Sequence, residues 1–116
     1  KIEDGNPEVE AHQAAQERAA RAEAALAPLA ESSDEARAWL LGAREAGLRA
    51  ELWLAVRRKA RGQSTSADLD RLAERFRKQA AAVAEFMTGR YRPAEVHVVR
   101  EDRYESTLRL IGLLKW

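Results

Sequence analysis

Residues 66–88 read SADLDRLAERFRKQAAAVAEFMT, and this stretch decides the fold class because its apolar side chains recur at intervals of three and four. The apolar positions are Leu69, Leu72, Ala73, Phe76, Ala80, Val83 and Met87. Charged residues lie mostly on the opposite face, which is typical of a helix with one side against a core. We therefore predict a helix over residues 66–88 that buries Phe76 and ends at Gly89.

An earlier helix is expected over about residues 7–31. Asn6 can cap its first amide groups, and Pro7 suits the first helical position, where an amide hydrogen would have no helical partner. The predicted inner face consists of Val9, Ala15, Ala19, Ala22, Leu26 and Leu29. Most of these residues are alanines, so their burial stabilises the helix only a little per residue. Pro28 removes one hydrogen-bond donor and is expected to kink or end the last turn.

A helix is also predicted over about residues 34–61. Ser32 and Glu35 have the spacing of a capping box at its start. Its apolar stripe comprises Trp39, Leu40, Ala43, Ala46, Ala50, Trp53 and Leu54, with Gly47 at the margin. Gly42 and Gly47 each lower the helix propensity by about 1 kcal/mol, which indicates either a close helix crossing or a bend.

The C-terminal part departs from these patterns. Pro93 is expected to break the helical chain, and residues 96–99 are too few and too β-branched to count as helical. We therefore expect an extended crossing segment there. Asp102 can cap a last helix with Glu105 at its third position, and this shorter helix is expected over about residues 102–115.

Together these elements predict one all-α domain over residues 1–116, a helical bundle of three long helices plus a shorter C-terminal helix. A chain of 116 residues suits one domain, because two separate cores would each be small. Hydrophobic residues make up 46% and charged residues 34%, as in Ala-, Glu-, Arg- and Leu-rich helical proteins. The polar connector from Gly62, the expected C-cap, to Ser66 is short and favours antiparallel neighbours.

The composition also bears on the compartment. Cysteine is absent, which excludes disulfides and Cys-based metal sites but leaves the compartment open. No apolar run approaches the ~20 residues that span a bilayer, and no signal-peptide pattern is present, so we expect no membrane partner. The localisation stays unknown, with the cytoplasm favoured. The chain begins at Lys1, which is compatible with a processed protein or with a domain of a longer one.

The main charged feature is a basic run at the end of the second predicted helix: Arg57, Arg58, Lys59 and Arg61. Two interpretations are open, contact with nucleic-acid phosphates or neutralisation of the helix dipole by solvated cations. The second is favoured because residues 36–61 carry seven basic and two acidic side chains, or +5, whereas residues 7–31 carry two and five, or −3. Adjacent helices of opposite charge attract one another, so the basic run can be accounted for without a ligand.

No catalytic, cofactor-binding or metal-ligating residue is predicted. His12 and His97 are the only histidines, and neither has the paired His, Asp or Glu spacing of a metal site. The sequence contains none of the common nucleophile motifs or glycine-rich phosphate loops. We therefore expect a chain that is not an enzyme and needs no cofactor.

A second candidate interaction site lies in residues 89–95, which read GRYRPAE. Tyr91 lies between Arg90 and Arg92, an arrangement that can stack on a base or a sugar. The same three residues can also anchor a chain turn when the ring packs and the guanidinium groups pair with carboxylates. The anchoring interpretation is favoured.

The same segment resembles a known family. A helix that ends in an aromatic residue or Met, followed by Arg90-x-Arg92-Pro93-x-Glu95 and a last short helix, is similar to the helical C-terminal region of some bacterial family 20 glycoside hydrolases, the β-N-acetylhexosaminidases. The resemblance covers about the last half of the chain and rests on this motif. In that family the region follows a catalytic (β/α)8 barrel, which holds the catalytic Asp-Glu pair. The resemblance therefore implies an accessory region and transfers no catalytic residue to this chain.

These observations favour a non-catalytic interaction or accessory module. The Ala-rich first helix is the expected surface for a protein partner or for a second copy, so self-association through this helix is predicted. Two alternatives stay open: a C-terminal accessory domain or fragment of a glycoside hydrolase, and a helical protein that binds nucleic acid weakly through its basic run. Nucleic acid ranks below a protein partner, because the net charge of +1 provides no long-range attraction.

Overall fold

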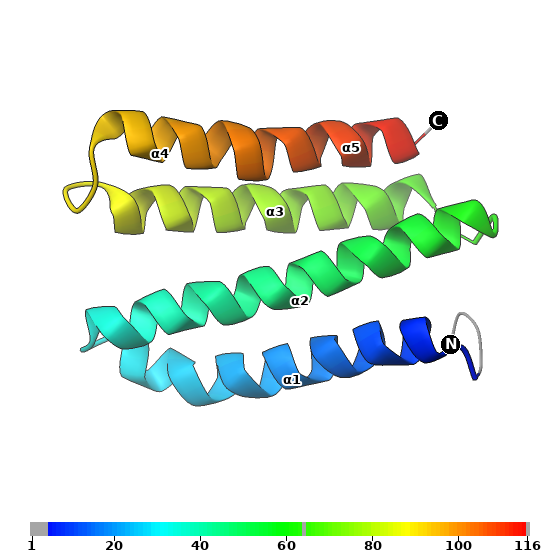
Figure 1. Ribbon diagram of the computed structural model, residues 1–116, viewed down its shortest axis with the longest axis horizontal. Helices are drawn as coiled ribbons and strands as arrows, with labels where there is room; N and C mark the ends of the chain where they lie inside the picture. The colour runs from blue at the N-terminus through cyan, green and yellow to red at the C-terminus, as the bar shows by residue number, and fades with distance from the viewer. Residues whose placement is uncertain (1–4, 64, 116) are drawn as a thin grey trace. The chain divides into compact units, whose positions relative to one another are not determined.

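The computed structural model describes residues 5–63 and 65–115. These residues form three long helices and a C-terminal helical segment without a strand, so the predicted all-α fold class is confirmed (Figure 1). The elements are α1 (Pro7–Ala30), α2 (Asp34–Ala60), α3 (Ser66–Met87), α4 (Pro93–Val99), the π-helical turn η1 (Arg100–Glu105) and α5 (Ser106–Leu114). The chain divides into two compact units, Lys1–Ser64 and Thr65–Trp116.

The first unit is a hairpin of the antiparallel helices α1 and α2, which lie side by side (Figure 1). The side chain of Asn6 accepts hydrogen bonds from the amides of Glu8 (2.9 Å) and Val9 (3.2 Å), so the predicted cap is confirmed. Pro28 does not stop α1, which continues to Ala30.

The two ends of α2 differ in how well they match the prediction. Its N-cap is Ser33, whose hydroxyl oxygen accepts a hydrogen bond from the amide of Ala36 (3.1 Å), so the capping box from Ser32 is wrong by one residue. At the other end Gly62 has a φ of 70°. Glycine adopts this left-handed conformation without steric cost, and the predicted glycine stop is therefore confirmed.

α1 and α2 approach each other closely at one of the two glycines in α2. A Cβ added to Gly47 would lie 3.2 Å from the Cβ of Ala19, whereas nothing lies within 4 Å of a Cβ added to Gly42. The close crossing predicted from these glycines is thus confirmed at Gly47 alone.

Two further contacts join the helices of this hairpin. The imidazole of His12 stacks on the indole of Trp53, with ring centroids 4.0 Å apart and planes inclined by 5°. Nε of Arg44 donates to a carboxylate oxygen of Glu23 at 3.0 Å. The second contact pairs the basic helix with the acidic one, as expected from their opposite charges.

The buried face of α2 differs from the predicted stripe. Trp39 is 66% exposed and Leu29 of α1 is 57% exposed, so the prediction that both are buried is wrong. The buried residues of α2 are Ala36, Leu40, Leu41, Leu48, Ala50, Leu52, Leu54 and Ala55. Leu41, Leu48 and Leu52 bring large aliphatic side chains to another side of the helix, so the buried face turns toward them and away from Trp39.

In the second unit α3 follows the prediction closely. Thr65 caps its start, because its hydroxyl oxygen accepts a hydrogen bond from the amide of Asp68 at 3.1 Å, and Gly89 follows its end with a φ of 83°. The buried residues are Leu69, Leu72, Ala73, Phe76 and Gln79. Val83 and Met87 are only half-buried.

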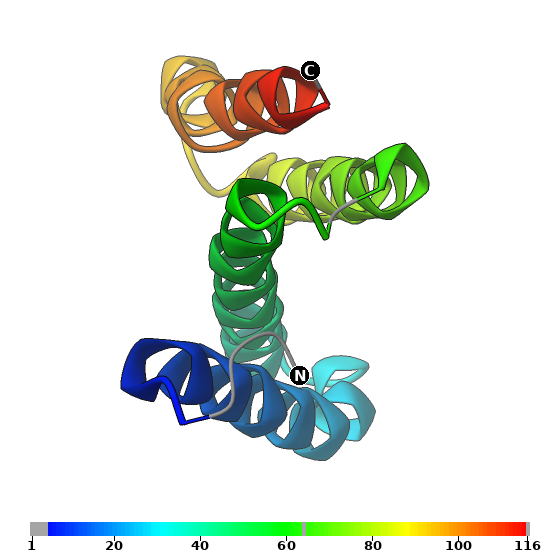
Figure 2. The same ribbon diagram turned by 90° about the vertical axis from the view of Figure 1, so that its right-hand side faces the viewer.

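The predicted extended segment before the last helix is wrong. Residues 93–114 are helical throughout, from α4 through η1 to α5, so the last helix does not begin at Asp102. Pro93 occupies the first position of α4, where its fixed φ favours a helix start, and Glu95 lies in the first turn. Figure 2 shows the segment from α4 to α5 as one continuous helical ribbon from orange to red. Valine costs only roughly 0.5 kcal/mol of helix propensity, too little to prevent this helix.

The π-helical turn η1 explains why α-helical periodicity fails in this segment. Half-buried Val96 and Val99 are followed by the buried residues Tyr104, Thr107 and Ile111, at spacings of three, five, three and four. A spacing of five does not fit an α-helix, but it fits the i→i+5 hydrogen bonding of a π turn. The π turn therefore keeps the buried side chains before and after it on one face of the segment. Within this unit, η1 and α5 pack against α3.

Candidate interaction groove on the first helical hairpin

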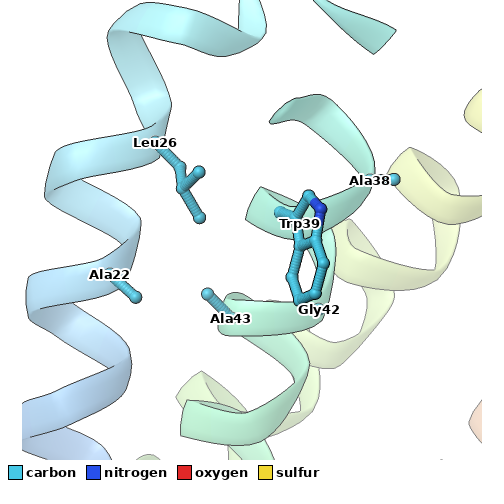
Figure 3. A pocket seen from close by; sticks show the side chains of 6 residues that line it. All are labelled: Ala22, Leu26, Ala38, Trp39, Gly42 and Ala43. Carbon is cyan, nitrogen blue, oxygen red and sulfur yellow. The ribbon is translucent and has the colours of Figure 1, made fainter. Parts of the chain in front are cut away.

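An open apolar groove of about 540 Å³ lies between α1 and α2 within the first unit (Figure 3). We call it the Trp39 groove, and its lining residues are Ala22, Leu26, Ala38, Trp39, Gly42 and Ala43. Figure 3 shows Ala22 and Leu26 pointing from α1 toward α2, which carries Trp39 and Ala43. No lining side chain is charged, and the volume falls within the ~300–1,000 Å³ of typical ligand sites.

The groove exists because small side chains lie beside one large one. Ala22 and Ala43 are too short to fill the space between the two helices, and Gly42 contributes no side chain. Nothing lies within 4 Å of a Cβ added to Gly42. The indole of Trp39 consequently forms a wall of the groove and keeps most of its surface in water.

The end of the groove next to the helix turn is surrounded by uncharged residues, whereas the Glu23–Arg44 pair lies beside the other end. Residues 24–30 of α1 and residues 38–43 of α2 contain no charged side chain, and the two runs face each other next to the turn between the helices. Leu29, which is 57% exposed, extends the apolar surface toward the end of α1. Contiguous exposed apolar surface of this kind often marks an interaction site.

Covering Trp39 would release considerable free energy. A Trp side chain presents ~150–250 Å², so the exposed 66% amounts to roughly 100–165 Å². At ~25 cal/mol per Å² its burial is worth about 2.5–4 kcal/mol. Among residues 5–63, Trp39 is therefore the largest apolar side chain that stays mostly exposed.

The predicted basic run lies in the last turn of α2, well away from the groove along the helix. Arg57, Arg58 and Lys59 are half-buried and Arg61 is exposed. From Trp39 to Arg57 the helix rises by about 27 Å at ~1.5 Å per residue. The backbone carbonyls of this turn accept hydrogen bonds from the amides of Arg61, Gly62 and Gln63. The run thus forms a compact, capped helix end.

The predicted Arg–Tyr–Arg site lies in the second unit, at the turn between α3 and α4. The guanidinium of Arg90 lies 4.4 Å from the ring centroid of Phe86 and donates to the Phe86 carbonyl at 2.6 Å. Nε of Arg92 lies 3.7 Å from a carboxylate oxygen of Glu95. Arg90 therefore packs on the end of α3, whereas the side chain of Arg92 is 87% exposed and Tyr91 is 51% exposed.

The histidines and carboxylates form no chemical centre in the part of the chain that the structure describes. His12 makes a hydrogen bond through Nδ1 with the carbonyl of Glu8 (2.8 Å) and packs on Trp53, whereas His97 is exposed. Among the described residues no three His, Asp or Glu side chains gather as metal ligands would. Within residues 5–63 and 65–115, no helix has the length and apolar character that crossing a membrane requires.

Comparisons of this chain with protein-family models, with curated proteins and with solved structures gave no match. The resemblance of the C-terminal half to family 20 glycoside hydrolases therefore stays a prediction.

The Trp39 groove is the feature that sequence reasoning missed. The apolar stripe placed Trp39 in the core, because spacing along one helix does not show which side chains lie opposite it. The available signal was the pair of uncharged runs, residues 24–30 and 38–43, on either side of a predicted helix turn. In a hairpin such runs lie side by side, and alanines opposite a Trp cannot cover it.

Proposed function

We propose that this chain is a non-catalytic interaction module and that the Trp39 groove is its binding surface. The observation that carries the proposal is the 66% exposure of Trp39 in a groove without a charged side chain. Trp is enriched among the residues that contribute most to binding at protein interfaces, because it combines a large apolar area with few rotatable bonds.

The chemistry of the groove favours an apolar protein segment. It offers no cation to a phosphate, and the indole N–H of Trp39 is the only side-chain hydrogen-bond donor along its lining. A trough between two antiparallel helices can accept the apolar ridge of another helix. The function proposed is therefore recognition of helical apolar surface.

An apolar fluorescent probe tests whether the groove binds. We would titrate the chain with anilinonaphthalene sulfonate and follow the emission of the probe. The intact chain is expected to enhance the emission, and Trp39→Ala is expected to weaken probe binding at least tenfold without loss of helicity. Leu113→Ala is the matched control, because Leu113 is 69% exposed and belongs to the other unit.

Two results would contradict the proposal. One is the absence of probe binding to the intact chain at millimolar probe. The other is an equal affinity of the Trp39→Ala variant and the intact chain, since binding would then occur at another apolar surface. Far-ultraviolet circular dichroism of each variant separates loss of the groove from loss of the fold.

A further inference from the structure

We propose that the occupant of the Trp39 groove is the same groove of a second copy, so that two α1–α2 hairpins pair about a two-fold axis parallel to their helices. This inference rests on the proposed function, because it requires the groove to bind apolar helical surface. It names the partner that the proposed function leaves open.

The side of the hairpin that contains the groove carries a repeated pattern on both helices. On α1 the residues are Ala11, Ala15, Arg18, Ala22, Ala25 and Leu29, and on α2 they are Trp39, Gly42, Ala46, Arg49, Trp53 and Val56. Each series alternates spacings of three and four, and every member is exposed or half-buried. Such a seven-residue repeat is typical of a surface that packs against another pair of helices.

The two series are complementary in size when the axis is parallel to the helices. This symmetry places α1 of one copy over α2 of the other and keeps each residue at its own height. The contacts of Gly47 with Ala19 and of Trp53 with His12 set the register of the hairpin. Trp39 is therefore level with Ala25 and Leu29 of the second copy's first helix, and Trp53 is level with its Ala11 and Ala15. A large side chain on one copy therefore fills space beside alanines on the other, which close packing requires.

Charge favours the same arrangement. Residues 7–31 carry two basic and five acidic side chains, or −3, and residues 36–61 carry seven and two, or +5. Placing α1 over the α2 of the partner therefore brings opposite charges together. Arg18 and Arg49 are the charged members of the contact surface, and they come to about the same height in this arrangement. Glu45 lowers their repulsion, because its carboxylate oxygen binds Nε of Arg49 at 2.7 Å.

The available area matches a stable dimer. The 24 residues of α1 extend about 36 Å. Two helices ~9 Å apart and each ~10 Å across present a side about 19 Å wide, or roughly 700 Å². Stable interfaces bury about 600–1,000 Å² per partner, so the full side of the hairpin falls within this range and the groove alone does not.

Sedimentation velocity of the intact 13.0 kDa chain from low to high micromolar concentration tests this inference. We expect a dimer whose dissociation constant rises with salt, because opposite charges contribute to it. Ala46→Glu places a carboxylate in the contact surface and is expected to weaken dimerisation at least tenfold. Ala81→Glu, at an exposed alanine of α3, is the matched control and is expected to leave it unchanged.

Trp39→Ala provides a second variant, and it is also expected to dissociate the dimer while helicity is retained. A monomer at high micromolar concentration would overturn the inference. A dimer that survives both Ala46→Glu and Trp39→Ala would overturn it too, because the contact would then lie elsewhere. If the chain is monomeric but binds the apolar probe through Trp39, the inference fails and the proposed function stands. If neither binding nor pairing depends on Trp39, both fail.

Discussion

The imidazole of His12 lies parallel to the indole of Trp53, with ring centroids 4.0 Å apart and an angle of 5° between the planes. His12 belongs to α1 and Trp53 to α2, so the stack joins the two helices near the start of α1. The inner face of α1 consists mainly of alanines, and this stack adds a contact between two aromatic rings to it. It should therefore anchor the beginning of α1.

His12→Ala is expected to lower the free energy of unfolding by about 1 kcal/mol, the magnitude typical of a stacked ring pair. Urea denaturation followed by circular dichroism measures the change. His97→Ala is the control, because His97 is exposed, and its effect should stay within about 0.5 kcal/mol. Equal losses for the two variants would mean that the stack contributes nothing to stability.

The two glycines of α2 should respond differently to alanine. Gly42→Ala is expected to raise the free energy of unfolding by about 1 kcal/mol, because alanine favours helix and nothing lies within 4 Å of the added Cβ. Gly47→Ala should be less stable than Gly42→Ala, because its Cβ would lie 3.2 Å from that of Ala19.

Thermal unfolding measures the stability of these variants, and a double variant serves as the control. Combining Gly47→Ala with Ala19→Gly removes the close contact between the two methyl groups. The double variant should therefore be free of the crowding penalty and should show only the helix-propensity cost of the new glycine. A single Gly47→Ala variant as stable as Gly42→Ala would show that the two helices can separate without cost.

The parts of the fold that the sequence predicted are those decided locally. The Asn6 cap and the glycine stops at Gly62 and Gly89 depend on residues within one or two turns, and the structure has them. The periodicity of residues 66–88 likewise predicted a buried Phe76, which is 0% exposed. Local backbone chemistry and one-sided apolar spacing were sufficient for these features.

The parts that could not be predicted depend on what lies opposite each residue. Trp39 has helical spacing with Leu40 and Trp53, yet the side chains across from it, Ala22 and Leu26, do not cover it and it stays exposed. Val99 and Tyr104 are five residues apart, a spacing that joins one face only through a π turn. The groove and the true start of the last helix both follow from such non-local packing.

Phe76→Ala is expected to lower the free energy of unfolding by about 3–5 kcal/mol, because it leaves a cavity at a fully enclosed position of α3. Leu113→Ala removes an aliphatic side chain that is 69% exposed and should change stability by no more than about 0.5 kcal/mol. Chemical denaturation of both variants measures the difference. A loss below about 1 kcal/mol for Phe76→Ala would mean that the inner face of α3 is misassigned.

The last prediction concerns the basic run at the end of α2. Arg57, Arg58 and Lys59 are half-buried, and the backbone of this turn is closed by hydrogen bonds from the amides that follow. Cations in a last turn also stabilise the negative end of the helix dipole. We therefore expect this run to bind nucleic acid only weakly at physiological salt.

With about four phosphate contacts, the slope of log affinity against log salt on double-stranded DNA would be about −3 to −4, so that most binding is lost at 150 mM salt. Fluorescence anisotropy with labelled DNA and RNA measures this slope.

The test variant replaces the run, Arg57, Arg58, Lys59 and Arg61, with glutamine. The matched control replaces four cations of α3, Arg71, Arg75, Arg77 and Lys78, in the same way. If the intact chain binds with submicromolar affinity at 150 mM salt and only the first variant loses it, phosphate recognition rather than helix capping is the role of the run. Equal and weak binding by all three proteins is the expected result, because four cations on a chain of net charge +1 release few counterions.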